Sequence, residues 1–173
     1  MVSIQIADSS NAKAIAKLHA DSWKKFYKGI LTDKYLQEEV YEDRFSTWNN
    51  RFETPAPNQV VHIAIEKDRL LGFCCIFLDD DPVFGTLIDN IHVDSTLHKS
   101  GIGRMLVEKS AAFVLEKASL KKMYLWVYES NENARKAYEK LGGQNFETVE
   151  KKNPDGTKGQ VCRIVWNELV TGS

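Results

Sequence analysis

The 173-residue sequence predicts one α+β domain, with a sheet that is mostly antiparallel and contains one parallel crossover. Two features of the apolar pattern carry this prediction. Apolar residues recur at helical spacing in the first third of the chain, and the period changes to strand-like alternation near residue 60. No repeat, linker or low-complexity tract divides the series, so we expect a single domain over residues 1–173.

The first third of the chain predicts two helical segments. Two serines followed by a helical stripe predict a capped helix over about residues 10–27, which Gly29 ends. A second helical region covers about residues 33–52, and Pro55 and Pro57 close it.

The strands follow. Residues 60–66 and 69–78 are β-prone, and Lys67-Asp68 between them is typical of a hairpin turn. An acidic loop at residues 79–82 precedes a third strand over 83–93. The later elements are a helix over 102–119, a strand over 123–128, a helix over 131–141, and strands over 144–150 and 160–167. A strand, a helix and a returning strand in this order form the parallel crossover.

Charge and hydropathy exclude several classes of protein. The 23 basic and 24 acidic residues give a net charge of -1, so no global field favours nucleic acid or an anionic membrane. The apolar run Leu70–Leu78 has about half of the roughly 20 residues that a membrane-spanning helix needs. Residues 1–10 lack a secretion-signal pattern, so we expect a cytoplasmic protein without a membrane or nucleic-acid partner. Cys74, Cys75 and Cys162 have no Cys-x-x-Cys spacing, and we expect neither a disulfide nor a metal site.

The stretch that carries chemistry is a strand, a glycine turn and a helix start within residues 87–104. His98-Lys99-Ser100-Gly101-Ile102-Gly103-Arg104 opens the helix, whose first N–H groups lack intrahelical partners and favour an anion. Glycine lets a phosphate approach the backbone, and Lys99 and Arg104 add cationic contacts at the edge. Leu106 stands where a dinucleotide-binding motif needs its third glycine, so we expect a diphosphate site of another kind. A helix start that uses glycine only for packing is the alternative.

Two motifs resemble those of the GNAT superfamily of acyl-coenzyme A (CoA) dependent N-acyltransferases. His98-x-x-Gly101-Ile102-Gly103 resembles the Gln/Arg-x-x-Gly-x-Gly/Ala pyrophosphate loop, with His98 a departure at the first position. Asn131-x-x-Ala134-x-x-x-Tyr138-x-x-x-Gly142 resembles the pattern after the family's fifth strand. The resemblance is strongest over residues 83–143, and it implies a three-layer α/β/α sandwich with a central parallel strand pair.

The same resemblance implies a reaction. It implies an N-acetyltransferase that moves an acetyl group from acetyl-CoA to a primary amine of a small molecule or peptide, by direct attack in a ternary complex. The pantetheine arm is expected along Ile91, His92 and Val93, where two parallel strands splay apart and leave main-chain groups unpaired. The pyrophosphate is expected on the backbone N–H groups of Ser100, Gly101, Ile102, Gly103 and Arg104.

The resemblance identifies the candidate acid more directly than the general base. Tyr138 matches the family's acid and Asn131 matches a cofactor contact, although core packing and helix capping also explain these two residues. The position of a strand glutamate that serves as base in some members is Trp126 here, so that role is not carried over. Asp89 and His92 are the candidates for the general base, with Asp89 first on location, and a structural polar contact is the alternative for each. A regular strand puts them on opposite faces, and a bulge changes that.

The acceptor site is expected in the amino-terminal helical region. Trp23 and Tyr27 are candidates for an aromatic wall that suits an amine cation, and packing of the helix on the sheet is the alternative for Trp23. Two other functions stay open: a protein N-terminal acetyltransferase, and a non-catalytic acyl-CoA-binding regulatory module. Assembly as a homodimer also stays open.

Overall fold

The structure is a computed structural model that describes residues 1–97 and 99–169. Its strands are β1 (Ser3–Ile6), β2 (Gln59–Glu66), β3 (Arg69–Asp81), β4 (Gly85–Val93), β5 (Met123–Tyr128), β6 (Gln144–Lys152) and β7 (Lys158–Trp166). Its longer helices are α1 (Ala12–Phe26), α2 (Val40–Glu53), α3 (Ile102–Lys117) and α4 (Glu132–Lys140). Short turns of helix lie at Ser9–Asn11 and Ser95–Leu97, and a π-helical turn at Tyr35–Glu39 leads into α2.

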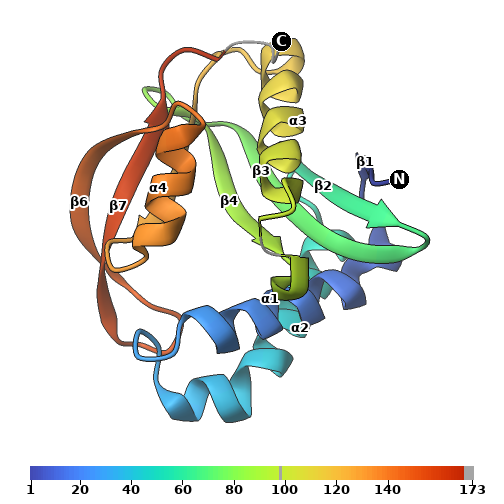
Figure 1. The fold of residues 1–173 in the computed structure, drawn as a ribbon, viewed down its shortest axis with the longest axis vertical. Helices are drawn as coiled ribbons and strands as arrows, with labels where there is room; N and C mark the ends of the chain where they lie inside the picture. Colours follow the sequence, from blue (N-terminus) through green and yellow to red (C-terminus); the bar gives the residue numbers. More distant parts are fainter. Residues whose placement is uncertain (98, 170–173) are drawn as a thin grey trace.

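Within these residues the strands form one sheet in the order β1-β2-β3-β4-β5-β7-β6 (Figure 1). Only the β4–β5 pair is parallel, and the other neighbours pair antiparallel. The crossover that joins β4 to β5 runs through α3, because parallel strands need a long connection. The predicted mixed sheet with one central parallel pair is confirmed.

Helices cover both faces of the sheet, and adjacent residues of β3 show how. Phe73 and Cys75 pack into a cluster with Trp48 of α2, whereas Cys74 and Ile76 belong to the cluster under α3. Successive side chains of a strand point to opposite faces, so one strand supplies both layers. Figure 1 shows α3 and α4 over the same side of the sheet, with α1 and α2 gathered together away from them. The expected three-layer arrangement is confirmed.

The amino-terminal strand β1 escaped the sequence analysis. It pairs with β2, from Ser3 opposite Ile65 to Ile6 opposite His62. Three of its four residues are exposed, because it is an edge strand with little cover on either face. A strand that buries so little carries no alternating apolar pattern, and that pattern is the signal by which strands are found in a sequence.

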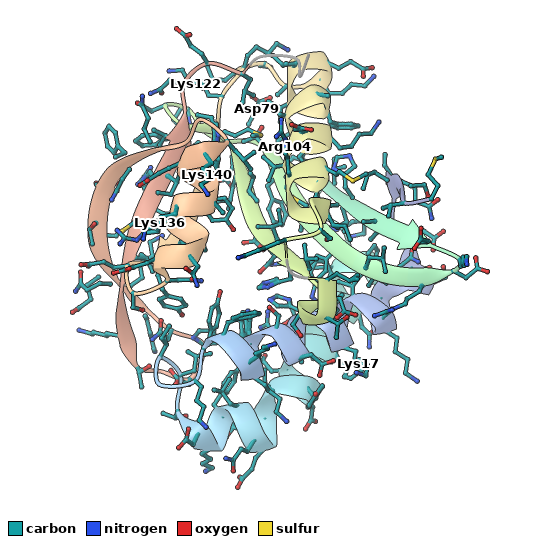
Figure 2. All side chains as sticks on the ribbon, viewed as in Figure 1. Lys17, Asp79, Arg104, Lys122, Lys136 and Lys140 are labelled. Carbon is teal, nitrogen blue, oxygen red and sulfur yellow. The ribbon has the colours of Figure 1, made fainter. Side chains whose placement is uncertain are left out.

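The acidic segment predicted as a loop is the end of β3, which runs through Asp81. The Asp79 carboxylate accepts the backbone N–H groups of Ser119 and Leu120 at 2.8 and 2.9 Å, just beyond the end of α3. Figure 2 shows Asp79 beside that end of the helix. These bonds satisfy main-chain donors after the helix, so this carboxylate anchors α3 to the sheet.

The two parallel strands separate soon after they meet. Their pairing covers only Thr86–Ile88 of β4 and Met123–Leu125 of β5. Beyond Leu125, β5 stays paired with β7 as far as Tyr128, and β4 stays paired with β3. Figure 1 shows β4 and β7 diverging toward α1. The side of β4 that faces β5 therefore has no strand partner after Ile88 among the described residues, as expected for splayed strands.

A β-bulge lies at the point of separation. Asn90 pairs with Cys75 and Ile88 pairs with Ile76, which leaves Asp89 as an extra residue in β4. A bulge shifts the side chains beyond it relative to those before it. The alternation of side chains between the two faces of the sheet is therefore shifted in the residues of β4 after the bulge.

Candidate active site

The glycine turn before α3 has a backbone that suits an anion. Lys99 and Gly101 have φ of 63° and 86°, and Gly101 is the residue that precedes the first turn of α3. The Ser100 N–H donates to the Leu97 carbonyl at 3.1 Å, so this one of the five expected donors is already used. The N–H groups of residues 101–104 make no hydrogen bond to another described residue, and they are the donors left for a ligand. His98, the first residue of the motif, lies outside the described residues.

The two glycines of the turn are there for different reasons. Gly101 has a positive φ, which L side chains rarely adopt, so its backbone conformation favours glycine. Gly103 has no such constraint, and a Cβ added there would meet only the Val93 Cγ2, at 3.7 Å. Nothing in the described fold requires a glycine at position 103. The missing side chain leaves the backbone of the turn open to close approach, which is the space that a diphosphate would need.

Cationic side chains border the turn and the neighbouring helix. Arg104 makes an ion pair with Glu108 at 2.7 Å, and both side chains are exposed. Figure 2 shows Arg104 on α3 and Lys136 and Lys140 on α4, the two helices on the same face of the sheet. Lys99 is exposed in the turn itself.

Asn131 and Tyr138 are both positioned by α4. The Asn131 Oδ1 accepts the Ala134 N–H at 3.3 Å, so its role as a helix cap is confirmed. Tyr138 lies one turn further along, and its half-buried ring contacts Trp166 edge to face at a centroid distance of 6.2 Å. The Tyr138 hydroxyl makes no hydrogen bond to any described residue. A packed ring with an uncommitted hydroxyl is consistent with core packing and with proton donation.

The pKa of Tyr138 is raised above its ordinary value, chiefly by burial and also by the nearby Tyr27 and Cys74. Tyr27, at the end of α1, contacts Tyr128 of β5 edge to face at 5.0 Å. Burial, with Tyr128 close by, raises the pKa of Tyr27 as well. Residues from α4, α1 and β5 therefore meet where β4 and β5 separate, and the tyrosines there are protonated at neutral pH.

His92 faces α1 from the diverging half of β4. Its Nδ1 lies 2.7 Å from the Ser22 Oγ, and its ring centroid lies 4.6 Å from that of His19. Burial lowers the pKa of His92 to about 3, and the positive charge of Arg44 contributes. The imidazole is thus neutral at neutral pH, with a hydroxyl that fixes its orientation.

Asp89 turns out to share a face with His92. His92 pairs opposite Phe73, which packs toward α1 and α2, and the Asp89 carboxylate binds Arg51 of α2 at 2.8 Å. The bulge is the reason that the strand alternation does not separate them. An ion-paired carboxylate favours the structural interpretation of Asp89, so the geometry favours His92 of the two candidates.

The two acceptor-wall candidates differ in exposure. Trp23 is only 8% exposed and packs with residues around the start of α2, and the Arg44 guanidinium covers its ring at 4.3 Å. This favours the packing interpretation for Trp23. Tyr27 is partly exposed beside Tyr128, which leaves it as the better-placed wall residue.

Three residues of this region were missed as functional candidates: Ser22, Tyr128 and Arg51. Ser22 lies on the buried face of α1, and a serine in a predicted apolar stripe was a usable signal. Tyr128 ends a strand that was correctly predicted. Arg51 is far from Asp89 in sequence, and no local pattern links the two.

Among the described residues, no three metal-ligating side chains are clustered, and none of the helices is long and apolar enough to span a bilayer.

Three buried histidines lead us to expect that the free energy of unfolding depends on pH. Burial lowers the pKa of His62 to about 4 and of His92 to about 3, and it lowers that of His19 well below the usual range. The unfolded chain, with histidine pKa values near 6.5, then binds more protons than the folded chain below pH 6.5. We expect the free energy of unfolding to fall by about 1.2 kcal/mol for each histidine between pH 6 and 5.

Denaturant titrations across this pH range measure that slope. His62→Asn keeps a polar group near the Ser110 hydroxyl, which lies 3.0 Å from the His62 Nδ1, and removes the titrating ring. The variant should lose one histidine's share of the slope, whatever its stability at pH 7. An unchanged slope would show that His62 does not contribute.

The fold and the glycine turn beside an open strand edge together define an acyltransferase-like architecture. The chain belongs to the Acetyltransferase (GNAT) family, whose model matches residues 14–143. The resemblance inferred from the two motifs is therefore confirmed. Among curated proteins, the uncharacterized N-acetyltransferase YuaI of Bacillus subtilis (strain 168) is 30% identical over 154 residues, covering 85% of this chain and 86% of that protein.

Solved structures agree on the fold. The PaiA N-acetyltransferase of Thermoplasma acidophilum, crystallised in complex with coenzyme A, matches with a TM-score of 0.73 and 15% identity. The match covers 95% of this chain and 98% of that one. PH1933 of Pyrococcus horikoshii OT3 matches with a TM-score of 0.72 and 20% identity, over 98% of this chain and 100% of that one. At these identities the likeness concerns the fold.

Proposed function

We propose that this protein transfers an acetyl group from acetyl-CoA to a primary amine of a small molecule or peptide, by direct attack in a ternary complex. One observation carries the proposal. Among the described residues, the edge of β4 that faces β5 has no strand partner after Ile88, and the N–H groups of residues 101–104 in the turn next to Val93 bond to no other residue. Tyr27 and Tyr128 meet at the ends of α1 and β5. The name of the relative YuaI and the coenzyme A bound to the PaiA structure support the same function.

The donor substrate is bound mainly by main chain. The N–H groups of residues 101–104 hold the pyrophosphate, and the absence of a Cβ at Gly103 lets it come close. The amides of the pantetheine arm pair with Ile91, His92 and Val93 as an added strand would. Lys99 and Arg104 supply secondary positive charge, and the free amide nitrogen of Asn131 contacts the arm.

The acceptor must be neutral to attack. An alkyl ammonium with a pKa near 10.4 is neutral in only about one molecule in 2,500 at pH 7, so the acceptor must lose a proton to solvent before it attacks. The proton that leaves the nitrogen as the C–N bond forms passes to solvent through a water that donates a hydrogen bond to His92. His92 is neutral and held by Ser22, and its pKa of about 3 makes it too weak a base to keep the proton itself. A backbone N–H near His92 or Val93 stabilises the oxyanion.

The leaving group also needs a proton. As the tetrahedral intermediate collapses, the C–S bond breaks and its electron pair stays on sulfur, and the Tyr138 hydroxyl donates the proton that yields free CoA thiol. Its raised pKa keeps Tyr138 protonated before this step. Tyr138 then regains a proton from solvent, which balances the proton that the nitrogen released.

Acetyl-CoA with a radiolabelled acetyl group tests the proposal. The purified protein is incubated with a panel of polyamines, amino acids, amino sugars and peptides with free amino termini, and free thiol and labelled product are both measured. We expect label on an amine in equal amount to the thiol released. Label only on peptide amino termini would make the protein an N-terminal acetyltransferase. CoA binding with no transfer to any amine would point to a regulatory module.

A further inference from the structure

We propose that the ion pair between Arg51 and Asp89 is a positioning device that holds the bulge of β4 in place and so keeps the donor-binding edge open. The inference rests on the proposed function, because that edge is where the pantetheine arm is placed. Neither residue touches the reacting atoms in this proposal. Their effect passes through the backbone of β4.

The position of the bulge is the first support. Pairing between β4 and β5 ends at Ile88, and the extra residue Asp89 comes directly after it. The strand therefore leaves its parallel partner at the point where its own ladder with β3 is interrupted. A bulge increases the local bend and twist of a strand, which is what the separation of two parallel strands requires.

Arg51 contacts both strands at this point. Its Nη2 lies 2.8 Å from the Asp89 carboxylate on β4, and its Nη1 lies 3.8 Å from the Cys75 Sγ on β3. Cys75 is the residue of β3 at which the register shifts. One guanidinium thus spans the two sides of the bulge, which a point charge cannot do with the same geometry.

Arg51 itself is held from several sides. Its guanidinium stacks over Trp48 at 5.0 Å and lies 5.6 Å from the Phe77 ring centroid. Its backbone carbonyl accepts the Gln59 side-chain amide at 3.1 Å, which ties the end of α2 to the start of β2. Arg51 and Asp89 are 23% and 26% exposed, so solvent screens this pair less than an exposed one. A cation held rigidly in this way can stabilise the bulged conformation of β4 relative to a regular ladder with β3.

Loss of the pair has a specific consequence. With Asp89 free, β4 can take the regular ladder with β3, and a one-residue change of register turns the following side chains to the opposite face. His92 would leave Ser22 and α1, and the main-chain groups of Ile91 and Val93 would no longer present the same edge. The change therefore affects donor binding and the position of His92 together.

The test compares variants of the whole chain by CoA calorimetry, kcat, KM and Tm. Arg51→Met keeps the apolar stem over Trp48 and removes the charge, and we expect about tenfold weaker CoA binding and about tenfold lower kcat at temperatures well below Tm. Arg51→Lys should recover part of both. Asp89→Asn, nearly isosteric, should match Arg51→Met, and the double variant should be no worse than the weaker single variant, because both remove one interaction.

Arg69→Met is the matched control. It breaks the Arg69–Asp94 ion pair, 2.6 Å long with Arg69 58% exposed, and should change CoA affinity less than twofold. CoA binding by Arg51→Met and Asp89→Asn equal to that of the original chain would overturn the inference, even if Tm falls. Additive losses in the double variant would also overturn it. If the original chain itself binds no CoA, the proposed function fails instead, and the two failures are distinguishable.

Discussion

Replacement of Tyr138 by phenylalanine is expected to lower kcat about 100-fold while the CoA dissociation constant changes less than twofold. The substitution removes only the hydroxyl, and the ring keeps its edge-to-face contact with Trp166 and its place on the inner side of α4. Without a proton, the thiolate is a poorer leaving group in a buried site than the thiol. Removal of a group that acts only in the transition state lowers kcat and kcat/KM together.

The same chemical change elsewhere is the control for this prediction. Tyr124 lies on the part of β5 that is still paired with β4, opposite Leu87, and donates its hydroxyl to Asp80. Tyr124→Phe should leave kcat within twofold. Steady-state thiol release across pH 6–10 and calorimetry with CoA make the comparison, and full kcat for Tyr138→Phe across that range would exclude Tyr138 as the required acid.

Replacement of Gly103 by glutamate is expected to weaken CoA binding at least about 100-fold and to leave Tm nearly unchanged. Position 103 has ordinary φ and room for a Cβ, so the fold itself tolerates a side chain. A carboxylate there crowds the approach to the backbone donors of the turn and repels a diphosphate. We expect the effect on CoA binding and not on folding because, in the proposed complex, the pyrophosphate fills this space.

Two further variants separate crowding from charge. Gly103→Ala adds a methyl group alone, and we expect a weaker loss of affinity than with glutamate. Met105→Glu adds the same charge to the first turn of α3 at a partly exposed position on another side of the helix, and it should cost less than fivefold. Calorimetry with CoA and thermal unfolding cover all three. Equal CoA binding by Gly103→Glu and the original chain would mean that the pyrophosphate lies elsewhere.

The expected pattern of these variants also separates the two halves of the site. In the proposed function, Gly103 and its neighbours determine the affinity for the donor substrate, whereas Tyr138 acts in the chemical step. A protein that loses both properties in every variant would have lost its fold instead. The Tm measurements decide that case.

Local sequence patterns determined most of the elements. The strand over 123–128 and the hairpin turn at Lys67-Asp68 were predicted at their observed positions, because strand alternation and turn residues act over a few neighbours. The two motifs also identified the family, since a glycine turn at a helix start depends on residues a few positions apart. The weak edge strand β1 was missed because it buries too little to leave a pattern.

The tertiary structure alone decided how the candidate residues meet. The bulge at Asp89 puts His92 and Asp89 on one face, and Ser22 contacts His92 from 70 positions away in the sequence. Arg51 forms an ion pair with Asp89, the residue that the sequence analysis had ranked first as general base. Such contacts join segments that are distant in sequence, so their partners are set by packing of the layers. Residue types and spacing determined which family this chain belongs to, and they predicted where its phosphate turn lies. The register of β4 against β3 determined that Asp89 and His92 share the face toward α1 and α2, because one extra residue in a strand reverses every face after it.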